Sequence, residues 1–291
     1  AARPPRPERA SASRLTRRIL RGVAILVAIV ALWEGLKFLG GTPWRLPGAS
    51  VRDPIIHRPP LLWPFVNDYN LPHIWNIAIA FTRPFERGTD ETLAAYLFGA
   101  AMYTWREAGI GFLVGSALGV ALASFFVHMR LLERAFVPYV IASQTIPIIA
   151  LTPIVVSWTS RLEFGGSGTN RIIAVAIVAT YLTFFPVTIA MLRGLRSFDP
   201  RALELMRSYA ASRPQVYWKL RLPASLPYLF TSMKIAATAS IVGAIIGEDT
   251  GGVQAGLGRV IITYAQYYIT GPEKLWATII ASALLGIAFF V

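Results

Sequence analysis

Long apolar runs without charged side chains constrain this 291-residue chain more than any other feature. Three uncharged runs cover residues 108–127, 135–160 and 172–192. Each reaches about the 20 residues that a transmembrane helix requires. Residues 222–247 are interrupted only by Lys234, whose long side chain can reach toward one face of a bilayer. Residues 275–291 are apolar up to the last position and predict a further span that continues past it.

A sixth apolar run near the amino terminus predicts the first membrane span. Residues 19–38 follow four closely spaced arginines, an arrangement that resembles a signal peptide. No small-residue cleavage site follows, and residues 33–37 continue a helical pattern, so we expect an uncleaved anchor. We assign residues 18–39 to this first transmembrane helix. Residues 1–17 are expected to form a cytoplasmic basic tail, disordered over residues 1–13.

The distribution of basic residues predicts how the spans are oriented. Residues 1–21 hold seven Arg and one Glu, and residues 193–221 hold seven basic and two acidic residues. By contrast, residues 40–107 hold six Arg and six acidic residues. The positive-inside rule then places both termini and residues 193–221 in the cytoplasm. This topology accounts for the formal charge of +13 without nucleic-acid binding. The predicted fold class is an all-α membrane protein with about six transmembrane helices.

Residues 40–105 are the least regular part of the chain and are predicted to lie on the outer side. Eight prolines between positions 43 and 84 forbid a long helix before Thr92. Tryptophans in this segment suit a membrane interface, where an indole ring is half hydrated. We expect one interfacial helix at about residues 72–81. Residues 106–291 should then form the core, with five transmembrane helices.

A short basic segment between two apolar runs, residues 198–223, is predicted to begin with a helix. Asp199 is a good N-cap, because its carboxylate can accept a bond from a backbone N–H of the first turn. Pro200 suits the first helical position, where a missing N–H costs nothing. The helix is expected to run to about Tyr209. An ordinary solvated loop is the alternative interpretation of these residues.

A second short helix is predicted to follow the first. Ser212 and Gln215 have the spacing of a capping box, in which each side chain bonds a backbone N–H at the other position. The helix should therefore begin at Arg213. The two helices would meet at the small residues Ala210 and Ala211 and form a rigid docking element.

The same segment resembles the cytoplasmic "EAA" motif of ABC importer permeases, which runs E-A-A, three residues, G, nine residues, I-x-L-P. The corresponding positions are Glu204, Ala210, Leu220, Leu222 and Pro223. Leu205 and Met206 replace the paired alanines, and Ala210 replaces the glycine, while the spacing is kept in full. Residues 207–213 and 221–228 resemble the nitrate/sulfonate/taurine branch, which includes permeases for thiamine and riboflavin precursors. The resemblance covers about residues 108–291.

This resemblance implies a type I ABC importer permease that imports a small polar solute across a bacterial cytoplasmic membrane. It also implies a homodimer, two ATP-binding subunits on the cytoplasmic side and a soluble solute-binding protein outside. The chain itself would be no enzyme, because ATP and Mg would bind to the partner ATPase. The residues implied to couple the permease to that ATPase are Glu204, Tyr209, Ala210, Ala211, Ser212, Arg213, Leu222 and Pro223.

A polar triplet in the third span is the candidate translocation pathway. Ser143, Gln144 and Thr145 are consecutive, and lipid offers them no hydrogen-bond partner, so they should face protein or a watery cavity. Pro147 follows and can kink or open the helix. Interhelical packing is the alternative role, since small polar residues commonly join membrane helices. The resemblance favours the pathway, because the equivalent helix is similar to one that lines it.

Two acidic residues end the fifth span. Glu248 and Asp249 are candidates for an outer gate or a contact with the binding protein, and the alternative is a pair of solvated helix-end charges. In the second span, Gly111, Gly115 and Gly119 recur every four residues, which favours close helix packing and is a weak signal for dimerisation.

Several expected motifs of other protein classes are missing from the sequence. It contains no G-x-x-x-x-G-K-[S/T] phosphate loop, so we expect no ATP site on this chain. It has no cysteine, and its three histidines are far apart, so no metal set is recognisable. The second, third and fourth spans, as bounded above, lack acidic residues, which disfavours an ion-coupled carrier. An ATP-independent secondary carrier or channel remains the alternative function. The sequence does not identify the transported substrate.

Overall fold

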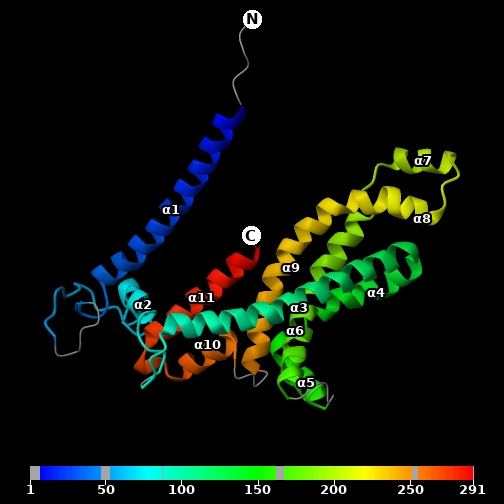
Figure 1. Ribbon diagram of the computed structural model, residues 1–291. Coiled ribbons are helices and arrows are strands. Elements are labelled where there is room, and N and C mark those ends of the chain that lie inside the picture. The colour runs from blue at the N-terminus through cyan, green and yellow to red at the C-terminus, as the bar shows by residue number, and fades with distance from the viewer. Residues whose placement is uncertain (1–6, 47–52, 87, 162–166, 251–254, 291) are drawn as a thin grey trace, which may run out of the picture.

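The computed structural model describes residues 7–46, 53–86, 88–161, 167–250 and 255–290, and these are overwhelmingly helical (Figure 1). The long helices are α1 (Pro7–Leu39), α3 (Leu93–His128), α6 (Ser167–Gly194), α9 (Leu222–Thr250) and α11 (Pro272–Phe290). The shorter helices are α2 (Ile74–Ala80), α4 (Arg130–Ser143), α5 (Ile148–Ser160), α7 (Pro200–Ser208), α8 (Arg213–Val216) and α10 (Leu257–Gln266). Five of the described helices are long and apolar enough to cross a membrane, or six if α4 and α5 together form one broken span. The all-α membrane fold is confirmed.

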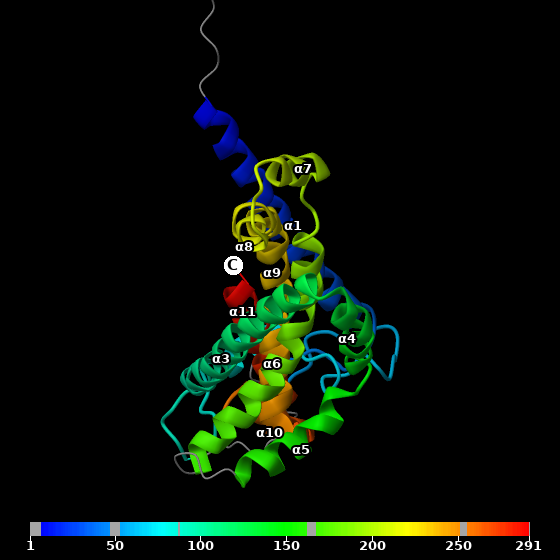
Figure 2. The ribbon, with the colours of Figure 1, turned by 90° about the vertical axis from the view of Figure 1, so that its right-hand side faces the viewer.

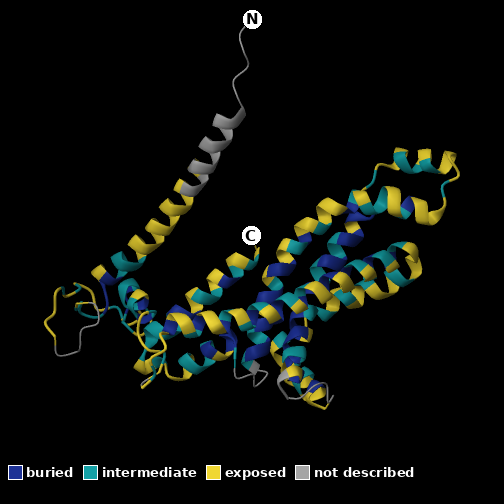
Figure 3. Cartoon of the chain, viewed as in Figure 1, coloured by how far each residue is buried: buried dark blue, intermediate teal, exposed yellow. Residues whose placement is uncertain are grey.

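Helices α3, α6 and α9 pack together at the centre of the molecule (Figure 3). The glycine stripe of α3 lies against α6. A Cβ atom added at Gly111 would lie 2.3 Å from the Cβ of Ala179, and one added at Gly115 would lie 2.6 Å from the Cβ of Thr183. Small residues thus let the two backbones approach closely, as in many membrane proteins. The predicted close packing occurs within the chain.

The third predicted span, residues 135–160, is divided into two helices at Pro147, where the sequence predicts a kink or opening. Helices α4 and α5 meet at a bend of 100° (Figure 2). Pro147 lies at the break, where it lacks an N–H to donate and disfavours helical geometry in the preceding residue. Pro153 lies inside α5 without ending it. The break therefore coincides with Pro147, whereas α4 and α5 accommodate Pro138 and Pro153.

Helix α1 stands away from the other membrane helices along most of its length, and its apolar side chains are exposed (Figure 3). It begins at Pro7, so the expected disordered tail is wrong for residues 7–13, which are helical. The carboxyl end of α1 joins the core, where the indole rings of Trp33 and Trp276 of α11 lie edge to face, 4.9 Å apart.

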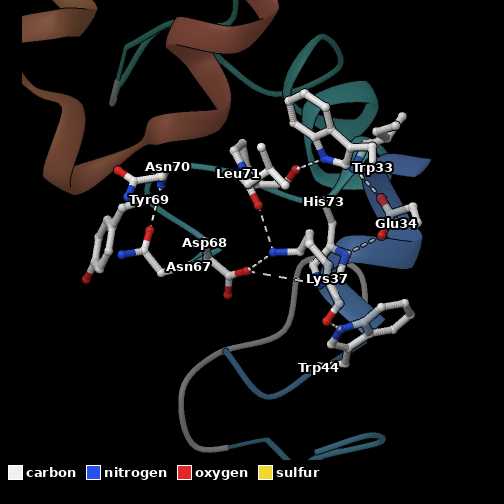
Figure 4. Close-up of polar contacts among 12 residues, drawn as sticks. Trp33, Glu34, Lys37, Trp44, Asn67, Asp68, Tyr69, Asn70, Leu71 and His73 are labelled. Carbon is white, nitrogen blue, oxygen red and sulfur yellow. Dashed lines mark hydrogen bonds and ion pairs between the residues drawn. The ribbon is translucent and has the colours of Figure 1, made fainter. Parts of the chain in front are cut away.

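A polar network holds residues 68–74 of the proline-rich segment to the end of α1 (Figure 4). Lys37 is only 1% exposed, and its Nζ donates to Asp68 Oδ1 at 2.6 Å and to the carbonyl oxygen of Leu71 at 2.7 Å. Glu34 accepts from His73 Nδ1 at 2.8 Å and from the backbone N–H of Ile74 at 2.9 Å. The buried lysine is therefore paired and hydrogen-bonded, as burial of a charge requires.

The expected helix near residues 72–81 is present as α2, which Glu34 caps from α1. Ile77 and Ala80 are buried, and α2 packs against α11. Helix α3 then begins after Thr92, whose side chain accepts from the N–H of Ala95. The proline-rich stretch thus ends where the sequence predicts.

Candidate functional site

The basic segment between α6 and α9 projects from one end of the molecule (Figure 1). Asp199 caps α7 by accepting a hydrogen bond from the N–H of Arg201 at 2.9 Å, and Pro200 is the first helical residue. Helix α7 ends at Ser208, with Tyr209 as its C-cap. Its start and end therefore match the prediction to within a residue.

Ala210 makes the turn between α7 and α8. Its φ is 52°, and it is the only non-glycine residue with positive φ among the described residues. This left-handed conformation is normally left to glycine because Cβ clashes with the backbone. The position is also the one where the EAA motif has glycine. Local geometry thus explains the residue type that the motif prefers there.

Helix α8 begins with the predicted capping box, in which the N–H of Ser212 donates to Gln215 Oε1 at 2.8 Å. The expectation of a second, separate helix is only partly right. After Val216 the chain passes through a π-helical turn, η1 (Tyr217–Arg221), and continues directly into α9. Helices α8 and α9 therefore belong to one interrupted rod. Leu222 starts α9 at the junction and Pro223 lies in its first turn.

The projecting segment carries large apolar side chains that nothing in the described chain covers. Leu205 is 58%, Tyr209 79% and Trp218 66% exposed. Leu205 and Tyr209 lie at the end of α7, and Trp218 lies in η1. Large exposed apolar residues on a projecting segment are typical of a surface that another molecule contacts. Glu204 and Arg213 are exposed beside them.

The polar triplet lies at the break between α4 and α5. Ser143 and Thr145 donate to carbonyl oxygens of their own chain, at Val140 and Ala142. The amide Nε2 of Gln144 is buried without a hydrogen-bond partner in the described part of the chain. Tyr181 of α6 donates to the carbonyl oxygen of Ser143. The hydrogen bond from Tyr181 thus links the break to α6. The Nε2 group of Gln144 can still donate a hydrogen bond.

Glu248 does not lie on the surface, so the alternative of a solvated helix-end charge is wrong for this residue. It is 0% exposed, and its Oε2 accepts from the N–H of Gly258 at 2.7 Å. Thr104 of α3 accepts from the N–H of Leu257 at 2.9 Å. The two side chains thus hold the start of α10 against α3 and α9. Asp249 is half-buried.

The turn before α10 requires glycine. Gly256 has a φ of 98°, and a Cβ added there would lie 2.2 Å from the carboxyl carbon of Glu248. Glu107 of α3 is also 0% exposed, and its carboxyl group faces that of Glu248. Sequence reasoning missed Glu107 because the predicted second span begins one residue later, whereas α3 begins 15 residues earlier, at Leu93 rather than Ala108. The burial of Glu107 could have been predicted only if the full length of α3 had been recognised in the sequence.

A cavity of about 490 Å³ between α6 and α9 was also missed. Its wall includes the two in-helix prolines Pro186 and Pro227, together with Tyr228, Thr231 and Ser232. The residues that line it do not include the polar triplet. Scattered prolines and hydroxyls carry no sequence pattern, so only packing of the two helices reveals this cavity.

Comparison with known proteins identifies the family. Residues 115–291 match the family described as "Binding-protein-dependent transport system inner membrane component". The chain is 35% identical over 184 residues to a formylaminopyrimidine transport permease protein of Halalkalibacterium halodurans, covering 62% of this chain and 68% of that relative. A nitrate import permease protein of Leptolyngbya laminosa is 29% identical, with 62% of this chain and 61% of the relative covered.

The fold comparison agrees with this match. An inward-facing structure of the MetNI methionine ABC transporter shares the fold with a TM-score of 0.50 at 22% identity, covering 68% of this chain and 92% of that one. Putative aliphatic sulfonate permeases of Bacillus subtilis and Escherichia coli are 28% and 29% identical to this chain. The chain belongs to the binding-protein-dependent inner-membrane components, and it is an ABC importer permease of the nitrate/sulfonate/taurine branch.

Proposed function

We propose that this permease couples closure of a partner ATPase to alternating access for a small polar solute. The observation that carries the proposal is the projecting segment, α7 to η1, which is rigidly capped and leaves Leu205, Tyr209 and Trp218 exposed. We assign it to the cytoplasmic side because it is basic. The ATPase would bind it through the turn at Ala210, Ala211 and Ser212.

The connection between this segment and the membrane supports a mechanical role. Helix α8 continues through η1 into α9, and α9 packs against both α3 and α6. A displacement of α8 by the ATPase would therefore be transmitted along one helical rod into the central spans. A π-helical turn such as η1 is commonly found at functional sites, where it lets a helix adjust its register.

Two regions of the membrane domain are assigned to the pathway. Gln144 lies at the α4–α5 break, and its buried amide has no hydrogen-bond partner among the described residues, so it would bind a solute once the break opens. Pro147 fixes the break itself. The cavity between α6 and α9 is a second candidate space, mostly apolar, with hydroxyl groups at Tyr228, Thr231 and Ser232. Asp249 is assigned to the outer mouth or to the binding protein, and Glu248 would hold the adjacent start of α10 in place.

The names of the relatives support the substrate class that we propose. Permeases of the branch are named for formylaminopyrimidine, riboflavin, nitrate, aliphatic sulfonates and taurine. These solutes are small or planar and carry polar groups. We therefore propose a small polar solute that a soluble binding protein delivers to a permease homodimer.

Coexpression with a candidate ATPase tests the proposal. Wild-type permease should copurify with the ATPase and show uptake that depends on ATP hydrolysis in proteoliposomes. Ala211→Trp should abolish copurification because the bulky ring would occupy the docking turn. Asp90→Trp, an equally bulky change at an exposed outer position, should copurify normally.

The alternative function predicts a different result in the same assay. A secondary carrier or channel would take up solute in vesicles that contain the permease alone. Uptake without the ATPase, or normal copurification of Ala211→Trp, would contradict the proposal.

A further inference from the structure

A cavity of about 440 Å³ opens where the α3–α4 connection, the carboxyl end of α6, α7 and η1 meet, at the end of the molecule that bears the projecting segment (Figure 1). Five arginines line it and will be called the arginine pocket: Arg130, Arg134, Arg196, Arg207 and Arg221. Glu133 is the single acidic residue of the wall. The five arginines come from four separate parts of the chain, so the fold brings them together and no single basic stretch of sequence contains them all.

The positive charges of the arginine pocket are largely uncompensated. Glu133 forms an ion pair with Arg196. Within the described part of the chain, the other four arginines of the pocket have no carboxylate within ion-pair distance. Arg221 lies within electrostatic range of Arg196, Arg130 and Arg207. Holding these guanidinium groups together costs Coulomb energy that a bound anion would offset.

The geometry of the pocket suits an oxyanion. Arg221 is half-buried, and its guanidinium carbon lies 5.1 Å from the ring centroid of Phe198, a contact that fixes the side chain beside the cavity. A guanidinium group presents paired N–H donors that match phosphate oxygens, and several such groups can bind one phosphate together. The polar ends of Arg130, Arg134 and Arg207 remain accessible, because these residues are exposed.

We propose that the arginine pocket binds a phosphate-bearing anion, with the headgroup of an anionic phospholipid as the favoured source. The pocket adjoins the ends of α3, α6 and the beginning of α9, so it lies at the level where a span leaves the membrane. Basic pockets between spans on the cytoplasmic side bind anionic headgroups. The choice of the cytoplasmic leaflet rests on the proposed orientation. The argument that the clustered arginines bind an anion is independent of that orientation.

Binding of this anion would connect the membrane domain to the projecting segment. Arg130 lies at the start of α4 and Arg196 just beyond α6, whereas Arg207 and Arg221 flank the α7–α8 turn. One phosphate group held by both sets would fix the turn relative to the central helices. Anionic lipid would therefore stabilise the surface that receives the ATPase.

The test compares two double variants in nanodiscs of phosphatidylcholine with and without phosphatidylglycerol. Arg130→Gln/Arg221→Gln removes two guanidinium groups of the pocket and leaves the Arg196–Glu133 pair intact. Arg193→Gln/Arg201→Gln removes the same charge from exposed positions outside the pocket. Melting temperatures are measured on the permease before and after the ATPase is added, and inorganic phosphate is titrated into the neutral nanodiscs.

Phosphatidylglycerol should raise the melting temperature of wild type and of the control, since a ligand of the folded state stabilises it. The pocket variant should require at least about 100-fold more anion for the same rise, because each charge-assisted hydrogen bond contributes roughly tenfold. A rise with inorganic phosphate in neutral nanodiscs would identify free phosphate as an additional source of the same group.

An equal rise in the pocket and control variants, or no rise in wild type with either anion, would overturn the inference. Loss of ATPase binding by the pocket variant in neutral nanodiscs, with no effect of anion on wild type, would assign the pocket to an acidic ATPase surface instead. Because lipid binding is read before the ATPase is added, failure of the coupling proposal would be seen separately.

Discussion

Ala210 adopts a φ of 52°, so its Cβ is strained at the turn that joins α7 to α8. Replacement by glycine relieves a clash of roughly 1–2 kcal/mol, and the extra freedom of unfolded glycine removes much of that gain. We therefore expect Ala210→Gly to match wild type in free energy of unfolding to within about 0.5 kcal/mol. Ala210→Val should lose about 2 kcal/mol, because a β-branched residue is poorly tolerated there.

Thermal melting of the purified permease measures this difference. Ala211→Val is the matched control, because Ala211 lies next in sequence and has no positive φ. Equal melting temperatures for Ala210→Val and Ala211→Val would show that the turn is not strained at residue 210.

Gln144 is the residue that best separates a pathway role from a packing role. Its buried Nε2 has no partner among the described residues, so Gln144→Leu should cost little folding stability, less than about 1 kcal/mol. If the amide contacts solute, uptake by reconstituted vesicles should fall while melting temperature and basal ATP hydrolysis are kept. Unchanged uptake by a well-folded variant would remove Gln144 from the pathway.

The contact between α1 and residues 68–74 includes the buried imidazole of His73. Burial lowers the pKa of His73 below its ordinary value of 6.5, and this effect outweighs the hydrogen bond to Glu34, which raises the pKa. His73 therefore binds a proton more weakly in the folded state than in the unfolded state. Stability of this contact should be complete above about pH 6.5 and should decline as pH falls below it.

Hydrogen exchange of residues 68–80, measured from about pH 8 to about pH 5, follows this contact directly. Wild type should lose protection in α2 at the acidic end. His73→Gln, which has no imidazole to protonate, should show a flatter profile. A wild-type profile with no loss at low pH would contradict the expected role of His73.

The contact between α3 and α6 depends on the absence of a side chain at Gly115. A Cβ there would lie 2.6 Å from the Cβ of Thr183 and 2.9 Å from the carbonyl oxygen of Thr180. Gly115→Ala should therefore destabilise the fold by roughly 1–3 kcal/mol through overpacking. Gly109→Ala meets no atom within 4 Å and should be neutral or slightly stabilising, since alanine favours helix.

Melting temperatures of these two variants in the same detergent test the packing. The pair is matched because both substitutions add one methyl group to the same helix. Similar melting temperatures would show that α3 and α6 can separate at no cost.

The orientation of the whole molecule is open to a direct labelling experiment. The chain has no cysteine, so single introduced cysteines report without background. Ser212→Cys should be shielded from an impermeant thiol reagent in intact cells, and Thr89→Cys should be labelled. Permeabilised cells provide the control, in which both should react. The reverse pattern would overturn the orientation and, with it, the proposed side of ATPase contact.

The sequence by itself determined the features that depend on neighbouring residues. Apolar runs located five of the membrane-spanning helices, because span length and the absence of charge are local properties. Asp199, Pro200 and the Ser212–Gln215 pair located the ends of α7 and α8, because capping acts over three or four residues. Motif spacing identified the family through the same segment. The glycine stripe of α3 also correctly predicted close packing.

Tertiary structure decided everything that depends on which distant residues meet. It brought Glu107 of α3 to Glu248 of α9 and buried Lys37 against Asp68. It also gathered the arginine pocket from four elements. From the sequence alone, a charged residue is expected to be solvated. It is buried only where a partner, often distant in sequence, compensates the free energy lost when the charge leaves water. Local sequence thus determines the lengths and caps of the helices, whereas helix packing determines which charged residues are buried.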